Sequence, residues 1–445
     1  MGLVQGIRDY IGLKRRFARL DTEAVRRLHE RGVLELVEFA RENSALYREL
    51  YHGTSVRSLE DFARLPAVNK QIMMDNFDAL NTVSVSKSEA MAFALDKELN
   101  RDYLGYYREE FVVGLSSGTS GNKGLYLTPR ALTQRAPALF LARSGLPLGL
   151  LPFRILFLLR VFSQGFADLA APGVTLRYRS SMTPPAELIS AANDMRANVI
   201  MAPPSLLRIL APLAHLLKSK PRRVISYAEV LPSEDKLRLG AAFGCPVSEI
   251  YQTSEGQIGS PCRLGNLHIN EDLVYVELLD ANGHAIGPGE RSASMLVTNL
   301  VNRAQPLLRY EMNDIVELGQ PCPCGSSFRT IAKVIGRDDE VMWLRTASGS
   351  IRALFPDLLS RWVITTDDAI REFRVEMISP DLLRITLDLL PDADFADIAS
   401  RLKERFAREC AQFDIACGLD VRFDAISLPS SGAKLRRFYD LTRRA

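Results

Sequence analysis

Residues 111–128 read FVVGLSSGTSGNKGLYLT, and this stretch guides the interpretation of the whole chain. The apolar run Phe111–Val113 is typical of a buried strand, and glycines and small hydroxylated residues follow it directly. Because glycine tolerates positive φ and close approach of the backbone, successive N–H groups in such a loop can converge on one anion. Hydroxyl groups and Lys123 add further donors and a positive charge. The stretch therefore favours a loop that cradles a polyphosphate.

The loop differs from other glycine-rich motifs. No Gly-Lys-Ser or Gly-Lys-Thr occurs, which excludes a Walker A loop, and the absence of Gly-x-Gly-x-x-Gly weakens a dinucleotide site. Residues 114–118 satisfy the Gly-x-Ser-x-Gly pattern of a nucleophile elbow, but that elbow needs a helix directly after its serine, and here Thr119, Ser120 and Gly121 follow. A plain surface loop is the alternative for the cluster taken alone.

The pattern of the chain changes along its length. The first hundred residues read mainly as helix, with apolar residues at helical spacing in Thr22–Arg41. From Phe111 onward, apolar runs such as Val247–Tyr251 alternate with helical patterns, which indicates a sheet with helices on its faces. From Leu273 strand follows strand, as in an antiparallel sheet or distorted barrel, and after Gly336 the pattern is compact and mixed.

We therefore predict a multidomain α/β fold. A large N-terminal domain over residues 1–335 would contain helix-flanked sheets and an antiparallel, barrel-like subdomain. The charged turn at residues 336–340 would be the boundary, and residues 341–445 would form a small α+β C-terminal domain.

Composition and charge exclude several classes of protein. The chain has 445 residues, 47% hydrophobic and 24% charged, which is typical of a globular protein with a large core. Its 56 basic and 53 acidic residues nearly balance, which argues against a dedicated nucleic-acid binder. The most apolar stretch, residues 145–165, is interrupted by Arg154 and Arg160, and the N-terminus lacks the apolar core of a signal peptide. We expect a cytoplasmic protein without stable membrane anchoring.

Polar motifs follow the loop along the chain. Residues 224–231 (VISYAEVL) and 247–256 (VSEIYQTSEG) each read as a strand that ends in polar residues, where open α/β sheets place their ligands. Farther on come PLLRYEMND at 306–314, IGRDDE at 335–340 and PSSGAKLRRF at 429–438. Taken singly, each motif has an ordinary explanation as a solvated loop acid, a turn or a basic tail.

In this order and spacing, the motifs resemble the adenylate-forming (acyl-CoA synthetase) superfamily, and within it the phenylacetate–CoA ligase and coenzyme F390 synthetase-like branch. The resemblance covers essentially the whole chain. It implies that a carboxylate attacks the α-phosphorus of ATP, giving an acyl-adenylate and pyrophosphate, before the acyl group passes to CoA. It also makes residues 1–335 the AMP-binding domain, and residues 341–445 a mobile domain that rotates about Asp339 for a second half-reaction.

The resemblance implies a role for each matching residue. Thr253 would touch the α-phosphate, Glu255 would hold Mg²⁺, and Lys434 would neutralise charge between carboxylate and α-phosphate. Tyr251 would lie against the adenine, and Asp314 would bind both ribose hydroxyls. The full set of nucleotide contacts that it implies is Ser116, Ser117, Gly118, Thr119, Ser120, Gly121, Lys123, Ala228, Glu229, Tyr251, Gln252, Asp314 and Arg337.

A second group of residues has metal-ligand character. Five residues separate Cys262 from His268, and one residue separates Cys322 from Cys324. Three thiolates and one imidazole can form a closed tetrahedral site for structural zinc, and the alternative is that a cytosolic chain carries ordinary buried thiols. The cluster resembles one found in several members of the branch, where it would pin two loops of the antiparallel subdomain.

The chain departs from the family pattern at three places. Asn122-Lys123 replaces the proline-containing end of the phosphate loop, and Asn313 stands where glycine usually precedes the ribose-binding aspartate. After the hinge, Arg345 lacks the glycine that usually follows it. That loop helps to build the thioester-forming site, so the resemblance supports adenylation more strongly than the CoA step.

We therefore predict ATP-dependent activation of a carboxylic acid, aromatic or medium-chain, followed by transfer to CoA. Two alternatives stay open, namely adenylyl transfer to a hydroxyl, as in F390 synthetases, and a catalytically weak nucleotide-binding protein. From the family layout, the acyl pocket is expected near Ser163–Phe166, Pro203–Ser205, Tyr227 and Gln257. Relatives also suggest a homodimer.

Overall fold

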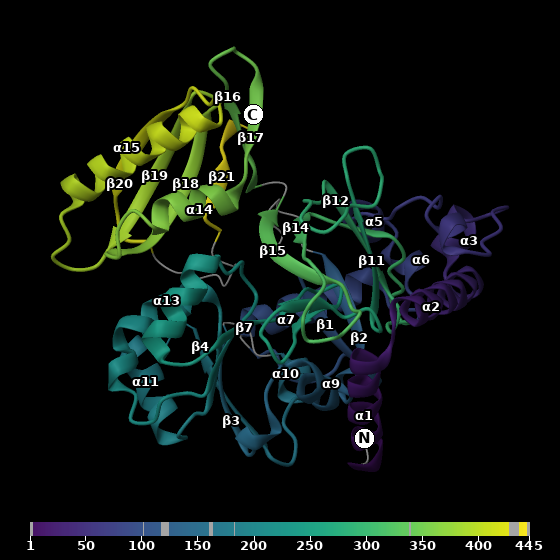
Figure 1. Cartoon of the computed structure of the whole chain (residues 1–445). Helices are drawn as coiled ribbons and strands as arrows, with labels where there is room; N and C mark the ends of the chain where they lie inside the picture. Colours follow the sequence, from purple (N-terminus) through teal and green to yellow (C-terminus); the bar gives the residue numbers. More distant parts are fainter. Residues whose placement is uncertain are drawn as a thin grey trace.

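The computed structural model describes residues 3–100, 102–116, 124–159, 163–181, 183–337, 340–426 and 436–442 (Figure 1). Its helices are α1 (Leu3–Arg19), α2 (Thr22–Asn43), α3 (Ala45–Leu50), α4 (Leu59–Phe62), α5 (Lys70–Asp75), α6 (Phe77–Leu80), α7 (Lys87–Asn100), α8 (Arg130–Thr133), α9 (Ala136–Arg143), α10 (Gln164–Ala167), α11 (Pro185–Asp194), α12 (Pro204–Leu210), α13 (Ser233–Phe243), α14 (Pro356–Ile364) and α15 (Phe395–Gln412). Its strands are β1 (Phe111–Leu115), β2 (Leu125–Pro129), β3 (Phe153–Leu159), β4 (Val174–Ser180), β5 (Val199–Ala202), β6 (Arg223–Ser226), β7 (Val247–Glu249), β8 (Tyr251–Gln252), β9 (Gln257–Pro261), β10 (Leu267–Ile269), β11 (Val274–Leu279), β12 (Ser294–Asn299), β13 (Tyr310–Met312), β14 (Asp314–Leu318), β15 (Thr330–Arg337), β16 (Met342–Arg345), β17 (Ile351–Leu354), β18 (Ile370–Ser379), β19 (Leu382–Leu389), β20 (Gly418–Phe423) and β21 (Phe438–Asp440). None of the described helices is both long enough and apolar enough to cross a membrane.

The N-terminal helices begin at residues that can cap a helix. The side chain of Asp21 accepts a hydrogen bond from the backbone N–H of Ala24 at the start of α2, and Asn69 plays the same part for α5. Most of the buried residues of α2 are apolar and recur at helical spacing, namely Val25, Val33, Leu36, Val37 and Ala40. The predicted helix over residues 22–41 is confirmed, and it continues to Asn43.

A parallel sheet of strand order β4-β3-β5-β6-β7 follows, with helices on its faces. Every residue of β5 is buried, as expected for a strand covered on both sides. On one face, Leu188 of α11 and Leu239 of α13 pack in the same cluster as Ile200. On the other, Phe140 of α9 packs with Phe157. Because β6 and β7 are neighbours, the segments that follow them emerge at the same edge of the sheet.

The antiparallel region differs from the sequence prediction in two ways. It forms two open sheets, of order β14-β15-β10-β9-β8 and β11-β12-β13, and the described residues form no closed barrel. The run Val247–Tyr251, predicted as one strand, is divided at Ile250, because β7 pairs with β6 while β8 pairs with β9. Ile250 packs in the core of the parallel sheet and Tyr251 packs against the other core, so the chain passes from one sheet to the other here.

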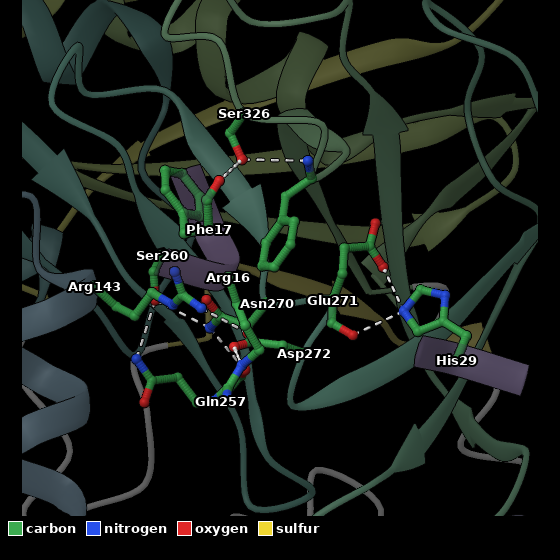
Figure 2. A network of polar contacts seen from close by, with 11 residues as sticks. Arg16, Phe17, His29, Arg143, Gln257, Ser260, Asn270, Glu271, Asp272 and Ser326 are labelled. Carbon is green, nitrogen blue, oxygen red and sulfur yellow. Dashed lines mark hydrogen bonds and ion pairs between the residues drawn. The ribbon is translucent and has the colours of Figure 1, made fainter. Parts of the chain in front are cut away.

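Polar side chains, most of them buried, join the N-terminal helices to the antiparallel region (Figure 2). Asp272 accepts hydrogen bonds from Arg16 of α1 and Arg143 of α9, each at 2.7 Å from nitrogen to oxygen. Nε2 of His29 on α2 lies 2.8 Å from the backbone carbonyl oxygen of Glu271. Burial lowers the pKa of the His29 imidazole, which favours the neutral ring donating to that carbonyl. The helices are thus fixed to the sheets by hydrogen bonds as well as by apolar packing.

The elements from β16 to β21, here called the C-terminal unit, have a hydrophobic core of their own. Their main sheet has the order β20-β19-β18-β21 (Figure 1). Trp362 of α14, Phe406 of α15 and Phe373 of β18 are buried in one cluster, whose buried members all lie between Met342 and Phe438. The unit therefore gains its packing mainly from its own side chains.

Candidate functional site

A cavity of about 1650 Å³ brings most of the described predicted site residues together. Its walls come from the β1–β2 hairpin, the segments after β6 and β7, and β14. The predicted residues that line it are Ser116, Ala228, Glu229, Tyr251, Gln252, Thr253, Glu255 and Asp314. Of the other predicted residues, Ser117, Gly118, Thr119, Ser120, Gly121, Lys123, Asp339 and Lys434 lie outside the described part of the chain, and Arg337 is described by its backbone alone.

At the β1–β2 hairpin, both ends of the glycine-rich loop are held together. The backbone N–H of Ser116 donates to the carbonyl oxygen of Gly124 at 2.8 Å, and the N–H of Gly124 donates to Oγ of Ser116 at the same distance. Gly124 has no room for a side chain, because a Cβ atom there would lie 2.9 Å from both Ser116 Oγ and the ring of Tyr126. Ser116 and Gly124 are therefore held together, and Ser116 lies on the cavity wall.

Glu255 is held at the cavity wall by two hydrogen bonds. The hydroxyl of Tyr126 donates to Oε1 of Glu255 at 2.6 Å and lies 3.0 Å from the hydroxyl of Tyr310. The side-chain amide of Asn299 donates to the backbone carbonyl of Glu255 at 2.7 Å. Burial and the neighbouring carboxylate raise the pKa of Tyr126, so its hydroxyl stays protonated and keeps donating at neutral pH. The carboxylate is thereby fixed, and carboxylate oxygen is the type of ligand that Mg²⁺ prefers.

Tyr251 and Asp314 lie together on a different part of the wall. The Tyr251 hydroxyl donates to Oδ2 of Asp314 at 2.6 Å. Asp314 begins β14 and is paired across the ladder with Arg337 at the end of β15, which brings two of the predicted ribose-binding positions side by side. Ala228, two residues after β6, has a φ of 70°, a strained value for a residue with a side chain. Such strain tends to occur where the backbone serves a ligand.

Aromatic and aliphatic side chains line another part of the cavity. The ring of Phe157 lies 4.8 Å from that of Phe166 and 5.3 Å from that of Tyr227, measured between centroids. The Tyr227 hydroxyl donates to the carbonyl oxygen of Leu158 at 2.9 Å, so its polar atom is satisfied within the protein. Of the expected acyl-pocket residues, Ser163, Gly165, Phe166, Tyr227 and Gln257 line the cavity, whereas Gln164 and residues 203–205 do not. Ser205 instead donates to the carboxylate of Glu229 from its N–H and its hydroxyl.

The four predicted zinc ligands come together in a separate cluster. The Sγ atoms of Cys262 and Cys322 are 3.9 Å apart, and Sγ of Cys324 lies 3.5 Å from Nε2 of His268. Tetrahedral ligands around zinc stand about 3.8 Å apart for two sulfurs and about 3.6 Å apart for sulfur and nitrogen. Nδ1 of His268 lies 2.8 Å from the carbonyl oxygen of Phe328, a contact that would fix the tautomer with Nε2 free to bind a metal. The donor set and its spacing thus fit zinc.

Comparison with known proteins places the chain in a family, although no family model matches it. Phenylacetate-coenzyme A ligase of Thermus thermophilus is 25% identical over 472 residues, which cover 95% of this chain and 98% of that protein. The crystal structure of 2-hydroxyisobutyryl-CoA ligase in the postadenylation state, in complex with 2-HIB-AMP, superposes with a TM-score of 0.75 at 18% identity, covering 97% of this chain and 92% of that one. The chain is a member of the adenylate-forming superfamily. It lies in the phenylacetate–CoA ligase-like branch. The chain is also similar to Protein CapK of Staphylococcus aureus, at 22% identity over 98% of this chain and 95% of that protein.

Membership of the adenylate-forming superfamily confirms the resemblance and the multidomain α/β fold class predicted from the sequence. The sequence reasoning missed residues of the site, among them Tyr126 and Asn299, which contact Glu255, and Lys70, which lines the cavity. Tyr126 lies in an apolar strand and Lys70 at the start of a short helix, so neither stands out by spacing or composition. Their part in the site depends on chain segments that meet only in the folded protein.

Proposed function

We propose that the chain activates a carboxylic acid with ATP, giving an acyl-adenylate and pyrophosphate, and then transfers the acyl group to CoA. The observation that carries this proposal is that Ser116, Glu255 and Asp314, from three separate elements, line one cavity. A phosphate loop, a metal-binding carboxylate and a ribose acceptor around one space are what ATP needs in order to be held. Relatives named as CoA ligases over nearly the full chain support the same reaction.

In the first half-reaction, an oxygen of the acid attacks the α-phosphorus and the bond to pyrophosphate breaks. No proton is transferred, so the protein's task is to align the reactants and to neutralise charge. Thr253 would contact the α-phosphate, and Lys434 would approach the carboxylate and the α-phosphate together. Glu255, fixed by Tyr126, would hold Mg²⁺, whose contribution is to offset negative charge on the phosphates.

The nucleoside would be held by the other part of the wall. Asp314 would accept hydrogen bonds from the ribose hydroxyls, and Tyr251, whose hydroxyl already binds Asp314, would present its ring to the adenine. Backbone groups at Ala228 and Glu229 would frame the base, with Gln252 beside it. Arg337 would face the ribose from its position opposite Asp314.

For the second half-reaction, the CoA thiolate attacks the acyl carbon and AMP leaves. We propose that residues 341–445 rotate about Asp339, within a hinge at residues 336–340, and exchange Lys434 for a surface that admits CoA. The separate hydrophobic core of the C-terminal unit supports such a movement, because the unit can move without unpacking itself.

The acid is expected to be apolar, either aromatic or of medium chain length. The ring cluster of Phe157, Phe166 and Tyr227 offers aromatic surface, and the Tyr227 hydroxyl is already bound to a carbonyl oxygen. Stacking and apolar contact would therefore bind the acyl group more strongly than hydrogen bonds would.

The cysteine–histidine cluster would hold structural zinc. Cys262, His268, Cys322 and Cys324 supply four ligand atoms within 4.8 Å of one another. A fully protein-ligated site has no open position for substrate, so its role would be to tie the loop after β9 to the loop before β15. We also propose that the protein acts in the cytoplasm, and as a homodimer.

Isotope exchange between pyrophosphate and ATP, run with a panel of aromatic and medium-chain acids, tests the proposal. We expect exchange with at least one acid, and a fall of at least about 100-fold in Lys434→Ala. CoA thioester formation with the same acid tests the second step, and a hydroxyl compound that accepts AMP instead would show the alternative acceptor. Measurable ATP binding without exchange for any acid would contradict the proposal and favour a nucleotide-binding protein.

A further inference from the structure

A buried cluster of charged side chains joins α12 to the C-terminal unit. The guanidinium of Arg208 on α12 donates to Oδ2 of Asp235 on α13 at 2.7 Å and to Oε2 of Glu372 on β18 at 2.9 Å. Arg437, which precedes β21, donates to both oxygens of Glu372 at 2.6 Å and 3.1 Å. None of these four side chains is more than 11% exposed. The contact therefore lies inside the boundary between the two parts of the molecule.

On the N-terminal side, the same helix touches the nucleotide cavity. Ser205, one turn before Arg208, donates to the carboxylate of Glu229 from its hydroxyl at 2.8 Å and from its backbone N–H at 3.1 Å. Glu229 and Ala228 line the cavity. A shift of α12 would therefore move the segment proposed to frame the adenine.

On the C-terminal side, Glu372, which binds Arg208, also binds a residue of the segment that lines the cavity. Residues 436–439 line it, and Arg437 among them is bound by Glu372. Arg437 follows Lys434 by three positions in the sequence. In this arrangement of the molecule, the contact between Arg208 and Glu372 brings the segment after Lys434 to the place where ATP would bind.

The balance of charge makes Arg208 the member that holds the cluster together. Without it, the carboxylates of Asp235, Glu229 and Glu372 would repel one another, with Arg437 as the remaining cation among the described members of the cluster. Removing one partner of a buried ion pair leaves an uncompensated charge, which is strongly unfavourable. The C-terminal unit can relieve that cost by moving away and exposing Glu372 to water.

We propose that Arg208 is a positioning residue, which docks the C-terminal unit on the nucleotide cavity for the adenylation step and must release Glu372 before the CoA step. The inference rests on the proposed function, because it assigns the docked arrangement to one half-reaction. Figure 1 shows the C-terminal unit beside α13, which also carries an exposed pair across the boundary, Arg238 with Asp368 at 2.6 Å.

The experiment measures the two half-reactions separately in Arg208→Gln. Pyrophosphate–ATP exchange uses the acid of the panel on which the wild type is most active, and thioester formation starts from the synthetic adenylate of that acid with CoA. We expect exchange to fall at least about tenfold, while thioester formation stays within about twofold of wild type. Arg208→Lys, which keeps the charge, should recover part of the exchange.

A matched control is Arg329→Gln, which removes another ion pair, with Glu271 at 2.7 Å, and whose guanidinium also donates to the carbonyl oxygen of Val276 on β11. It should lower stability without changing the ratio of the two rates. A fall of both half-reactions by the same factor in Arg208→Gln would overturn the proposal. If that variant does not fold, Arg208→Lys and the exposed Arg238→Gln decide, since both should lower exchange more than thioester formation, and an unchanged ratio in both would refute it.

Hydrogen exchange of residues 204–210, measured without substrates, separates this inference from the proposed function. We expect faster exchange in Arg208→Gln than in Arg329→Gln, because α12 loses its cover when the C-terminal unit undocks. Absence of pyrophosphate exchange in the wild type would defeat the proposed function and, with it, the catalytic part of the inference. Unchanged hydrogen exchange would defeat the docking contact itself.

Discussion

The nucleotide cavity and the cysteine–histidine cluster both draw residues from the antiparallel region, yet they arrange their polar groups in opposite ways. Glu255 and Asp314 line an open space of about 1650 Å³, and each accepts a hydrogen bond from a tyrosine hydroxyl. The ligand atoms of the cluster instead lie within 4.8 Å of one another. A substrate site must leave space and charged groups for its ligand, whereas in a structural metal site the protein supplies every ligand of the metal. Substitutions in the two places should therefore separate activity from stability.

The largest expected effect is on activity, in Glu255→Gln. Loss of the negative charge removes the proposed Mg²⁺ ligand, so pyrophosphate–ATP exchange should fall about 1000-fold. The melting temperature should stay near that of the wild type, because the glutamine oxygen can still accept from Tyr126 at the same place. Thermal unfolding and exchange are measured on the same preparation.

Tyr126→Phe tests a smaller change at the same site, the loss of the hydroxyl that donates to Glu255. It leaves the charge of Glu255 in place but removes the hydroxyl that orients it, so a fall of about tenfold is expected. If Tyr126→Phe lost as much exchange as Glu255→Gln, orientation rather than charge would account for the effect, and the metal role of Glu255 would be wrong.

The next effect is on stability, in Cys322→Ser. A serine cannot replace the thiolate as a zinc ligand, so unfolding free energy should fall by about 3 kcal/mol, while exchange at low temperature stays near wild type. Metal analysis of the purified wild type should give one zinc per chain. A metal-free wild type, or a fully stable Cys322→Ser, would show that the four side chains are ordinary buried thiols with a histidine.

The cysteine–histidine cluster and the cavity differ in how many of their residues can be predicted from the sequence, and the difference has a physical reason. The sequence predicts the cysteine–histidine cluster because only one residue separates Cys322 from Cys324, and closely spaced cysteines are typical zinc ligands. The sequence predicts Glu255 and Asp314 as site residues because the motifs that contain them resemble those of the adenylate-forming superfamily. Tyr126 and Asn299, which hold Glu255, come from an apolar strand and a strand end, and a tyrosine in such a strand reads as ordinary core.

The sheets show the same limit. The alternation of strand and helix over residues 153–249 is predictable from hydrophobic periodicity, since both patterns are local. The division of Val247–Tyr251 between two sheets is not, because one strand's pattern does not tell which neighbour each half will pair with. Contacts such as Arg208 with Glu372, 164 positions apart, depend on the packing of two finished units.

The smallest expected effect concerns pH and a third place in the molecule, the buried ion-pair cluster around Arg208 and Glu372. Like the cysteine–histidine cluster it is largely buried, but it joins the C-terminal unit to the cavity. Burial raises the pKa of Glu372 to about 7, with Glu229 and Asp235 adding to the rise and Arg208 opposing it. Arg437 and the backbone N–H of Phe373 also face this carboxyl. The usual pKa of a glutamate side chain is 4.5, so undocking, which exposes Glu372 to water, would lower its pKa from about 7 toward that value. Docking therefore takes up a proton between these limits and is favoured as pH falls through about 7.

Arg208→Gln removes the cation that opposes the rise, so its docked arrangement depends even more on a protonated Glu372. We compare the rate of pyrophosphate–ATP exchange in the variant with that in the wild type at each pH. In this ratio, the pH dependence of the chemical step, which both proteins share, cancels. We expect this ratio to be lowest at pH 8 and about threefold higher at pH 6, because a neutral Glu372 no longer needs a counterion. A ratio that is flat across this range, or that falls toward pH 6, would mean that Glu372 is ionised throughout in the docked arrangement.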